Sequence, residues 1–177
     1  MTYRNKLFFY HDSGPSDEKR ILIITTEDNL RLLEKHRVYF YDGTFDISPV
    51  LFTQLYTIHV IVKNKDLALV YAMLPNKKQT TYSKFFRTIK SLINKDPKSV
   101  NVDFEKAVFN ALSSVFLGVH IYGCYFHLTQ NFWHIRYVYK KLKAVLDNSF
   151  LPFLDYVGKY YIGNRLKPAR FPFPAWN

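Results

Sequence analysis

The chain has 177 residues, of which 48% are hydrophobic and 18% aromatic, a composition that supports a packed core in a single domain and excludes a disordered chain. Lys and Arg number 25 against 14 Asp and Glu, and the formal net charge of +11 either favours a nucleic-acid partner or only keeps the protein soluble. The single cysteine, Cys124, excludes an internal disulfide framework and a multi-cysteine zinc module, and with no signal-peptide core or long apolar run we expect an intracellular protein without a membrane span.

The first half of the chain has patterns typical of strands. Strands are expected over 6–10 and 20–26, and they can pair as an N-terminal hairpin. A short helix follows, with Thr26 near its N-cap and its end near Arg37. Three further strands are expected, and their short connections favour an antiparallel meander. They cover 39–45, 54–62 and 67–74.

From Thr80 onward the apolar residues recur with the period of helices. Helices are expected over 82–93, 104–116 and about 127–146, and strands over 99–102 and 119–126. A short helix within 150–163 and an extended tail over 165–177 complete the chain. This order predicts an α/β ribonuclease H-like fold, with a mixed five-stranded sheet of three antiparallel and then parallel strands flanked by helices.

Three regions follow from these elements. We expect the N-terminal hairpin and short helix over 1–37, the ribonuclease H-like core over 38–147, and a shortened C-terminal segment with its tail over 148–177.

Two aspartates stand where predicted strands end. Asp42 is the carboxylate of the apolar strand 39–45 and precedes Gly43, and Asp103 follows the strand 99–102. An unpaired buried charge is costly, so a carboxylate in such a strand is expected to hold a metal ion, to be hydrogen-bonded or to be solvated. Two carboxylates at neighbouring strand ends can hold Mg²⁺ or Mn²⁺ for phosphodiester cleavage, whereas the alternative is that each aspartate caps the turn after its strand.

Several segments, in order along the chain, resemble the MULE transposase domain of Mutator-like elements. They are Asp42–Phe45, Gln54–His59, Leu69–Pro75, Val102–Glu105 and Gly123–Asn131. The resemblance extends from about Arg20 to Asn131, and Phe171-Pro172 and Trp176-Asn177 are similar to the segment that follows the domain. It implies a nuclear DDE-type recombinase core, in which three acids bind two metal ions, Mg²⁺ or Mn²⁺, for cleavage and strand transfer at transposon ends.

The resemblance also implies roles for individual residues. Asp42 and Asp103 match the first two acids, which are catalytic and bind the metal. Cys124 and His127 match the family's Cys-x-x-His element. This pair can brace the active site or share a metal ion, and the alternative is a buried thiol beside a hydrogen-bonded histidine.

The third acid of the family has no clear counterpart. A glutamate is expected in a longer helical segment after the Cys-x-x-His element, but no Glu occurs after Glu105. Asp147 and Asp155 are either substitutes or solvated surface acids. We therefore expect impaired activity.

The helix expected over 127–146 carries basic residues beside aromatic ones. Arg136, Lys140, Lys141 and Lys143 suit contacts to DNA phosphates, although lysines on a helix are ordinarily its solvated face. The sequence therefore predicts a MULE-type catalytic domain or fragment or, alternatively, a non-catalytic DNA-binding or protein-interaction module on the same fold. The expected partner is DNA, at transposon ends or as non-specific duplex, with no membrane contact and with a homo-oligomer left open.

Overall fold

The computed structural model of the chain describes residues 2–3, 6–44 and 48–162. Its backbone contacts divide the chain into two units, 1–122 and 123–177, which are described separately below. The first unit is built on a seven-stranded sheet, and the second is helical.

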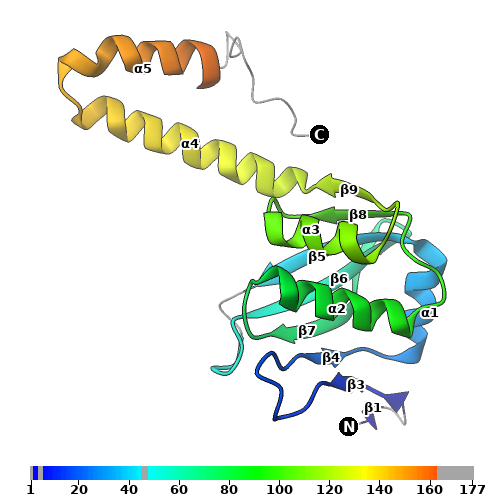
Figure 1. Cartoon of the computed structure of the whole chain (residues 1–177). Helices are drawn as coiled ribbons and strands as arrows, with labels where there is room; N and C mark the ends of the chain where they lie inside the picture. The colour runs from blue at the N-terminus through cyan, green and yellow to red at the C-terminus, as the bar shows by residue number, and fades with distance from the viewer. Residues whose placement is uncertain (1, 4–5, 45–47, 163–177) are drawn as a thin grey trace. The chain divides into compact units, whose positions relative to one another are not determined.

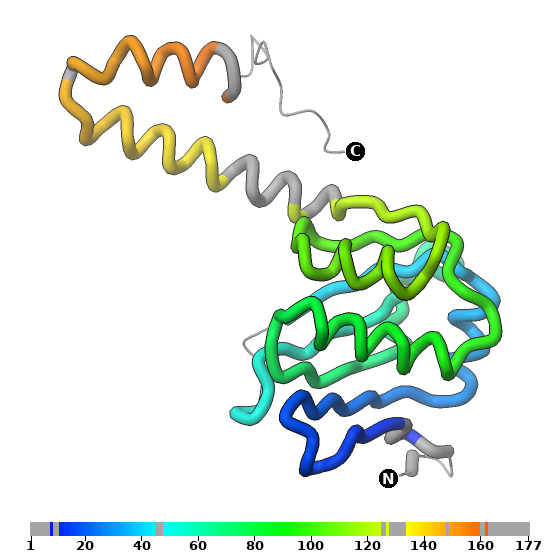
Figure 2. The backbone as a smooth tube through the Cα atoms, viewed as in Figure 1, coloured from blue at the N-terminus to red at the C-terminus, as the bar shows by residue number. Residues whose placement is uncertain are grey.

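The sheet of the first unit has the strand order β3-β4-β7-β6-β5-β8-β9, and the trace in Figure 2 runs from the blue N-terminal strands at one edge to the yellow-green β9 at the other. Its strands are β3 (Phe9–Asp12), β4 (Leu22–Ile24), β5 (Val38–Thr44), β6 (Gln54–Val62), β7 (Lys65–Leu74), β8 (Ser99–Val102) and β9 (His120–Gly123). A separate two-stranded ladder joins β1 (Thr2–Tyr3) and β2 (Lys6–Leu7).

The central strands confirm the predicted antiparallel meander. β5 pairs antiparallel with β6, and β6 pairs antiparallel with β7. Lys63 and Asn64 both have positive φ, of 48° and 60°, as expected for a two-residue hairpin turn whose twist matches that of its strands. On its other side β5 pairs parallel with β8.

The predicted number of five strands was wrong, because the N-terminal hairpin joins the same sheet. β3 pairs antiparallel with β4, and β4 continues the sheet by pairing with β7 through Leu22 and Met73. The alternation of apolar residues indicates a strand but does not specify the sheet edge that it joins. The expected strand over 119–126 also ends earlier, at Gly123, because Cys124 takes the extended conformation of a helix N-cap.

The described residues of the first unit form three helices: α1 (Glu27–His36), α2 (Gln79–Leu92) and α3 (Lys106–Val115). α1 begins as predicted, since the Thr26 side chain accepts a hydrogen bond from the backbone N–H of Asn29, and Arg37 ends it in the left-handed conformation. α2 and α3 lie side by side across one face of the sheet (Figure 1).

The core lies between α2 and the sheet and is rich in aromatic rings. Phe86 of α2 is fully buried, and its ring centre lies 5.4 Å from that of Tyr41 on β5 and 5.3 Å from that of Phe85. Tyr56 of β6 stacks on Tyr41 at 6.0 Å. These contacts anchor β5 immediately before Asp42.

Tyr41 brings a polar atom into this core. Its side chain is buried, and its hydroxyl has no hydrogen-bond partner among the residues that the structure describes. Because an unsatisfied buried hydroxyl is costly, Tyr41→Phe is expected to raise the free energy of unfolding by about 1 kcal/mol in urea denaturation. The matched control is Tyr122→Phe on β9, where the side chain is 54% exposed and no change is expected. A loss of stability in Tyr41→Phe would contradict this account.

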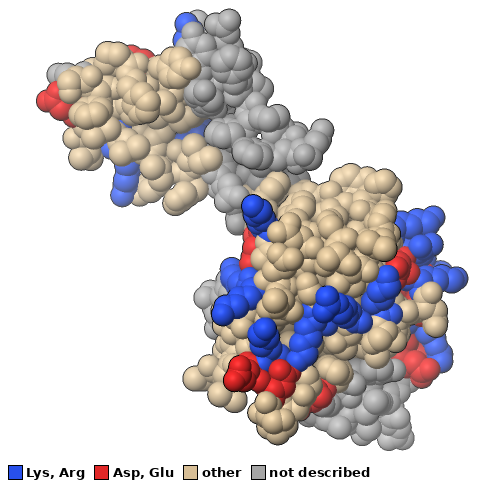
Figure 3. Space-filling model, viewed as in Figure 1, with Lys and Arg blue, Asp and Glu red and all other residues tan. Residues whose placement is uncertain are grey.

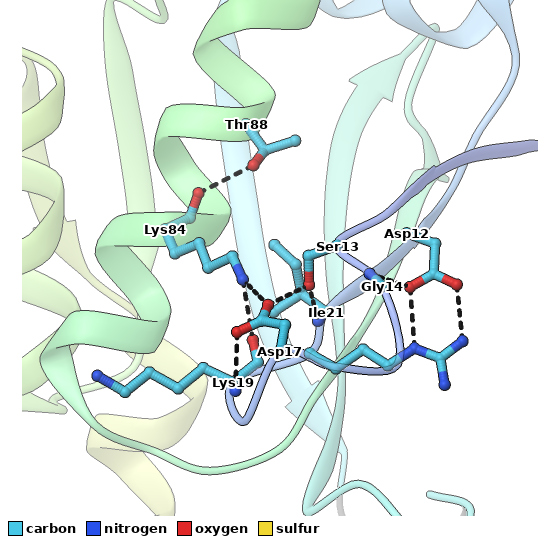
Figure 4. Close-up of polar contacts among 9 residues, drawn as sticks. Asp12, Ser13, Gly14, Asp17, Lys19, Ile21, Lys84 and Thr88 are labelled. Carbon is cyan, nitrogen blue, oxygen red and sulfur yellow. Dashed lines mark hydrogen bonds and ion pairs between the residues drawn. The ribbon is translucent and has the colours of Figure 1, made fainter.

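The loop between β3 and β4 is attached to α2 by charged groups (Figure 4). The Asp17 carboxylate accepts hydrogen bonds from Lys84 of α2 and from Ser13, which lower the pKa of Asp17 to about 2. Asp12 accepts from Arg20 Nη2 at 2.7 Å and Nε at 2.9 Å, and these bonds lower its pKa to about 2. The hairpin is therefore fixed to the helix as well as to β7.

The second unit contains α4 (Tyr125–Val145), a 3-10 turn (Asn148–Phe150), α5 (Leu151–Val157) and a π-helical turn (Gly158–Ile162). The Tyr139 hydroxyl donates a hydrogen bond to the Leu154 carbonyl at 3.1 Å, which joins the two helices. Gly158 allows this approach, since a Cβ there would lie 2.3 Å from the Tyr139 oxygen. The short helix predicted within 150–163 is confirmed over its described part, and the tail over 165–177 lies outside the described residues.

Candidate functional site

Asp42 and Asp103 lie at the carboxyl ends of two neighbouring parallel strands. The pairs that define the register of β5 and β8 are Val38 with Ser99, Tyr39 with Val100, and Phe40 with Asn101. Continuing this register by two residues sets Asp42 opposite Asp103. Adjacent strands lie about 4.8 Å apart, a spacing that suits two carboxylates sharing one divalent ion.

Both carboxylates belong to the less buried side of their strands. Side chains alternate along β5, with Tyr41 directed into the core beneath α2 and Asp42 on the opposite face, where it is exposed. Asp103 is exposed as well, and its Oδ1 accepts a hydrogen bond from the backbone N–H of Phe104 at 2.6 Å. Neither side chain pays the cost of a charge enclosed in the core.

A hydrogen-bonded chain crosses the core beside these strand ends. Gln54 Nε2 donates to the Tyr82 hydroxyl at 2.8 Å, and that hydroxyl donates to both carboxylate oxygens of Glu105 at 3.2 Å. Burial, together with the negative charge of Glu105, raises the pKa of Tyr82, so the phenol keeps the proton that it donates. Glu105 itself stands two residues after Asp103.

Gln54, the first residue of this hydrogen-bonded series, also lies against β5 at Gly43, the residue after Asp42. A Cβ at Gly43 would lie 3.0 Å from Gln54 Oε1 and 3.3 Å from the Tyr56 ring, so glycine lets the strand approach both side chains. The contacts therefore link the backbone after Asp42 to the turn after Asp103. Sequence analysis missed this arrangement, for which the one signal is Gln54, a polar residue at a position where the alternation of β6 expects an apolar one.

No third acid completes the site within the part of the chain that the structure describes. Among those residues, no three His, Cys, Asp or Glu side chains form a group that could hold a metal ion. Asp147 accepts from the backbone N–H of Ser149 at 2.8 Å, which lowers its pKa, and Asp155 accepts from Lys143 at 2.8 Å. Both acids belong to the second unit and make local contacts there.

Cys124 and His127 begin the second unit. Cys124 is a free, half-buried thiol at the N-cap of α4, and its side chain makes no capping hydrogen bond. His127 is half-buried one turn later, at the spacing at which helix side chains become neighbours.

The basic residues predicted to contact DNA lie on α4. Arg136 is half-buried, whereas Lys140, Lys141 and Lys143 are exposed. Lys143 donates a hydrogen bond to the Asp155 carboxylate, and this bond raises the pKa of Lys143. Lys141 Nζ lies 5.0 Å from the centre of the Tyr137 ring.

A second basic surface, which sequence analysis missed, lies on the first unit. Lys and Arg side chains spread over the face on which α2 and α3 lie (Figure 3). Exposed basic residues at these helices and at their N-terminal ends are Lys77, Lys78, Arg87 and Lys106. Part of the positive charge of the protein therefore lies on the face of the first unit that carries α2 and α3.

Comparison with known proteins agrees with the motifs. No curated protein matches the chain. Within the described residues, no helix is both long enough and apolar enough to cross a membrane. The family model of the MULE transposase domain matches residues 38–131, more than half of the chain, and this range contains Asp42, Asp103 and the Cys124–His127 element. The chain therefore belongs to the MULE transposase domain family.

Proposed function

We propose that this transposase-family domain binds duplex DNA together with a divalent metal ion, Mg²⁺ or Mn²⁺, at Asp42 and Asp103. We also propose that its cleavage and strand-transfer activity is impaired. The observation that carries the metal site is the parallel register of β5 and β8, which when continued sets the two aspartates opposite each other. The strand order β7-β6-β5-β8-β9, with the first three strands antiparallel, supports a ribonuclease H-like fold.

The chemistry of the two side chains fits a hard divalent cation. Mg²⁺ is usually bound by one or two carboxylates, several waters and substrate phosphates, and both aspartates are exposed. Asp103 is also oriented by the Phe104 N–H, which donates to its Oδ1 at 2.6 Å. When bound, the ion would polarise a phosphoryl oxygen and lower the pKa of a water molecule.

Impairment follows from the missing third acid. Two-metal cleavage in the family uses three acids, and the described residues contain no third carboxylate grouped with Asp42 and Asp103. A site with two carboxylates is therefore expected to bind one ion weakly. The chain has a single cysteine, which excludes a multi-cysteine zinc module. We therefore propose that the Cys124–His127 pair braces the start of α4.

DNA binding is supported by charge. The net charge is +11, and the basic surface at α2 and α3 adds to Arg136, Lys140 and Lys141 of α4. Contacts of this kind neutralise phosphates and release counterions, so the affinity for DNA is expected to fall steeply with salt. A nuclear location and a homo-oligomer are part of the same proposal, as in a transposase that acts on chromosomal DNA.

A metal-dependent nicking assay on duplex DNA tests the proposal, with Asp42→Ala and Asp103→Ala as controls. We expect salt-sensitive DNA binding and little or no cleavage by the wild type with Mg²⁺ or Mn²⁺. Robust cleavage that both substitutions abolish would overturn the impaired state and show an active nuclease. DNA binding that is indifferent to metal and to both substitutions would favour the second candidate, a non-catalytic DNA-binding module.

A further inference from the structure

Three polar residues lie on the same face of the sheet as Asp42. In the register of β5 and β6, Thr57 is directly opposite Asp42, and His59 is opposite Phe40. Since alternate residues of a strand share a face, Asp42, Thr57 and His59 point to the same side. Asp66 of β7 pairs with Ile61, which places Asp66 on that side too.

These side chains form a continuous hydrogen-bonded chain that ends on Asp42. His59 Nδ1 lies 3.0 Å from Asp66 Oδ1, and His59 Nε2 lies 2.8 Å from Thr57 Oγ1. The Thr57 hydroxyl in turn donates to the backbone carbonyl of Asp42 at 3.2 Å. Because a carboxylate only accepts and the one Thr57 hydroxyl proton goes to the Asp42 carbonyl, His59 donates from Nδ1 to Asp66 and from Nε2 to Thr57 Oγ1, and Asp66 thereby fixes the orientation of the ring.

The hydrogen-bonded series from Asp66 through His59 to Thr57 leads from solvent toward β5. Asp66 is 67% exposed, the His59 side chain is 22% exposed, and Thr57 is buried. A purely structural charge pair would not require the buried hydroxyl at its inner end. The inner end instead contacts the backbone of the residue that holds the first candidate carboxylate.

A β-bulge is what brings Asp66 to this face. The pairing of β6 and β7 shifts by one residue between Ile58 and His59, so that Ile58 pairs with Val70 and His59 with Ala68. Without the shift, Asp66 would pair with Val62 and point to the opposite face, because a slip of one residue reverses every side chain. Bulges of this kind occur next to active sites, where they redirect a side chain.

The bulged residue is Leu69, and it is anchored from a neighbouring segment. Its carbonyl accepts hydrogen bonds from Thr25 Oγ1 at 2.8 Å and from Asn29 Nδ2 of α1 at 2.9 Å. The irregular pairing is therefore held by two side chains outside the strands.

We propose that Thr57, His59 and Asp66 are positioning residues for Asp42, which hold the end of β5 so that the Asp42 carboxylate faces Asp103. This inference rests on the proposed metal site at the two aspartates. It gives a role to Thr57 and His59 of the Thr-Ile-His motif in β6, which are not themselves metal-binding acids.

The test compares Thr57→Val, which removes the hydroxyl and keeps the shape, with Thr57→Ser, which keeps the hydroxyl. His59→Gln breaks the chain farther out, and His120→Gln at the exposed histidine of β9 is the matched control. Two quantities are measured: the dissociation constant for Mn²⁺, and the ¹³C chemical shift of the Asp42 backbone carbonyl without metal. Residues that orient metal ligands typically contribute 10-fold or more to affinity, so Thr57→Val and His59→Gln are expected to weaken Mn²⁺ binding about 10-fold. Thr57→Ser and His120→Gln should stay near the wild type.

The outcomes separate this inference from the proposed function. If the wild type binds Mn²⁺ and Thr57→Val binds it equally well, the positioning role is wrong and the metal site stands. If neither the wild type nor His120→Gln binds Mn²⁺, the metal site is wrong, and the carbonyl shift decides the inference. A shift that moves in His59→Gln as well as in Thr57→Val, and returns in Thr57→Ser, supports it, and a shift that is unchanged in His59→Gln overturns it. A merely structural role would lower the unfolding temperature without changing the dissociation constant for Mn²⁺, and His59→Gln provides the same test if Thr57→Val does not fold.

Discussion

Phe86→Ala is expected to lower the free energy of unfolding by about 3–5 kcal/mol, the range found when a buried phenylalanine is truncated in a close-packed core. Phe86 is fully buried between α2 and the sheet, with ring contacts to Tyr41, Tyr56, Tyr82 and Phe116. Alanine would remove these contacts and leave a cavity that the neighbouring rings cannot fill without leaving their rotamers. Urea denaturation followed by far-UV circular dichroism measures the loss.

The control for this substitution is Phe153→Ala in α5, where the side chain is 63% exposed. The same change of chemistry is expected to cost less than about 0.5 kcal/mol there, because little apolar surface is buried. A loss below about 1 kcal/mol in Phe86→Ala would contradict the packing of α2 on β5 and β6. Such a small loss would also mean that Phe86 does not support the ring of Tyr41, the residue before Asp42.

Local patterns predicted the elements of this fold well, and long-range pairing less well. The meander followed from three strands with short links, and the helix that begins after Thr26 followed from its cap, since both depend on residues close in sequence. The hairpin of β3 and β4 was placed outside the sheet because its attachment depends on β7, many residues later. The Lys84–Asp17 contact that fixes its loop to α2 is equally remote in sequence.

The candidate site divides in the same way. As candidate metal ligands Asp42 and Asp103 could be predicted, because each stands at the end of an apolar strand and within a family motif, and that role stays a prediction. The Gln54–Tyr82–Glu105 chain could not, since it joins a strand, a helix and a turn through side-chain ends. The Asp66–His59 contact depends on a bulge, and a register shift leaves no mark on the alternation of β6. Sequence patterns thus indicate which acids stand at strand ends, whereas the side-chain contacts around those strand ends appear only when the sheet is assembled.

Mg²⁺ or Mn²⁺ is expected to raise the unfolding temperature of the wild type, and Asp42→Asn and Asp103→Asn are each expected to abolish that rise. A ligand that binds only the folded state at 100 times its dissociation constant adds about 2.7 kcal/mol, which corresponds to roughly 5–10 °C for a chain of this size. Asparagine keeps the shape and one oxygen but loses the charge that a hard cation requires. Asp103→Asn also keeps an acceptor for the Phe104 N–H, so the turn into α3 should remain intact.

The control for the metal effect is Asp28→Asn, at an exposed acid in the first turn of α1. Its unfolding temperature should rise with metal as much as that of the wild type, because the ion would bind at the strand ends and not to surface carboxylates in general. An equal rise in Asp42→Asn and in Asp103→Asn would place the ion elsewhere in the protein. Loss of the rise in only one of the two would mean that the aspartates do not share an ion, and the parallel register of β5 and β8 would then not extend to the side chains that follow it.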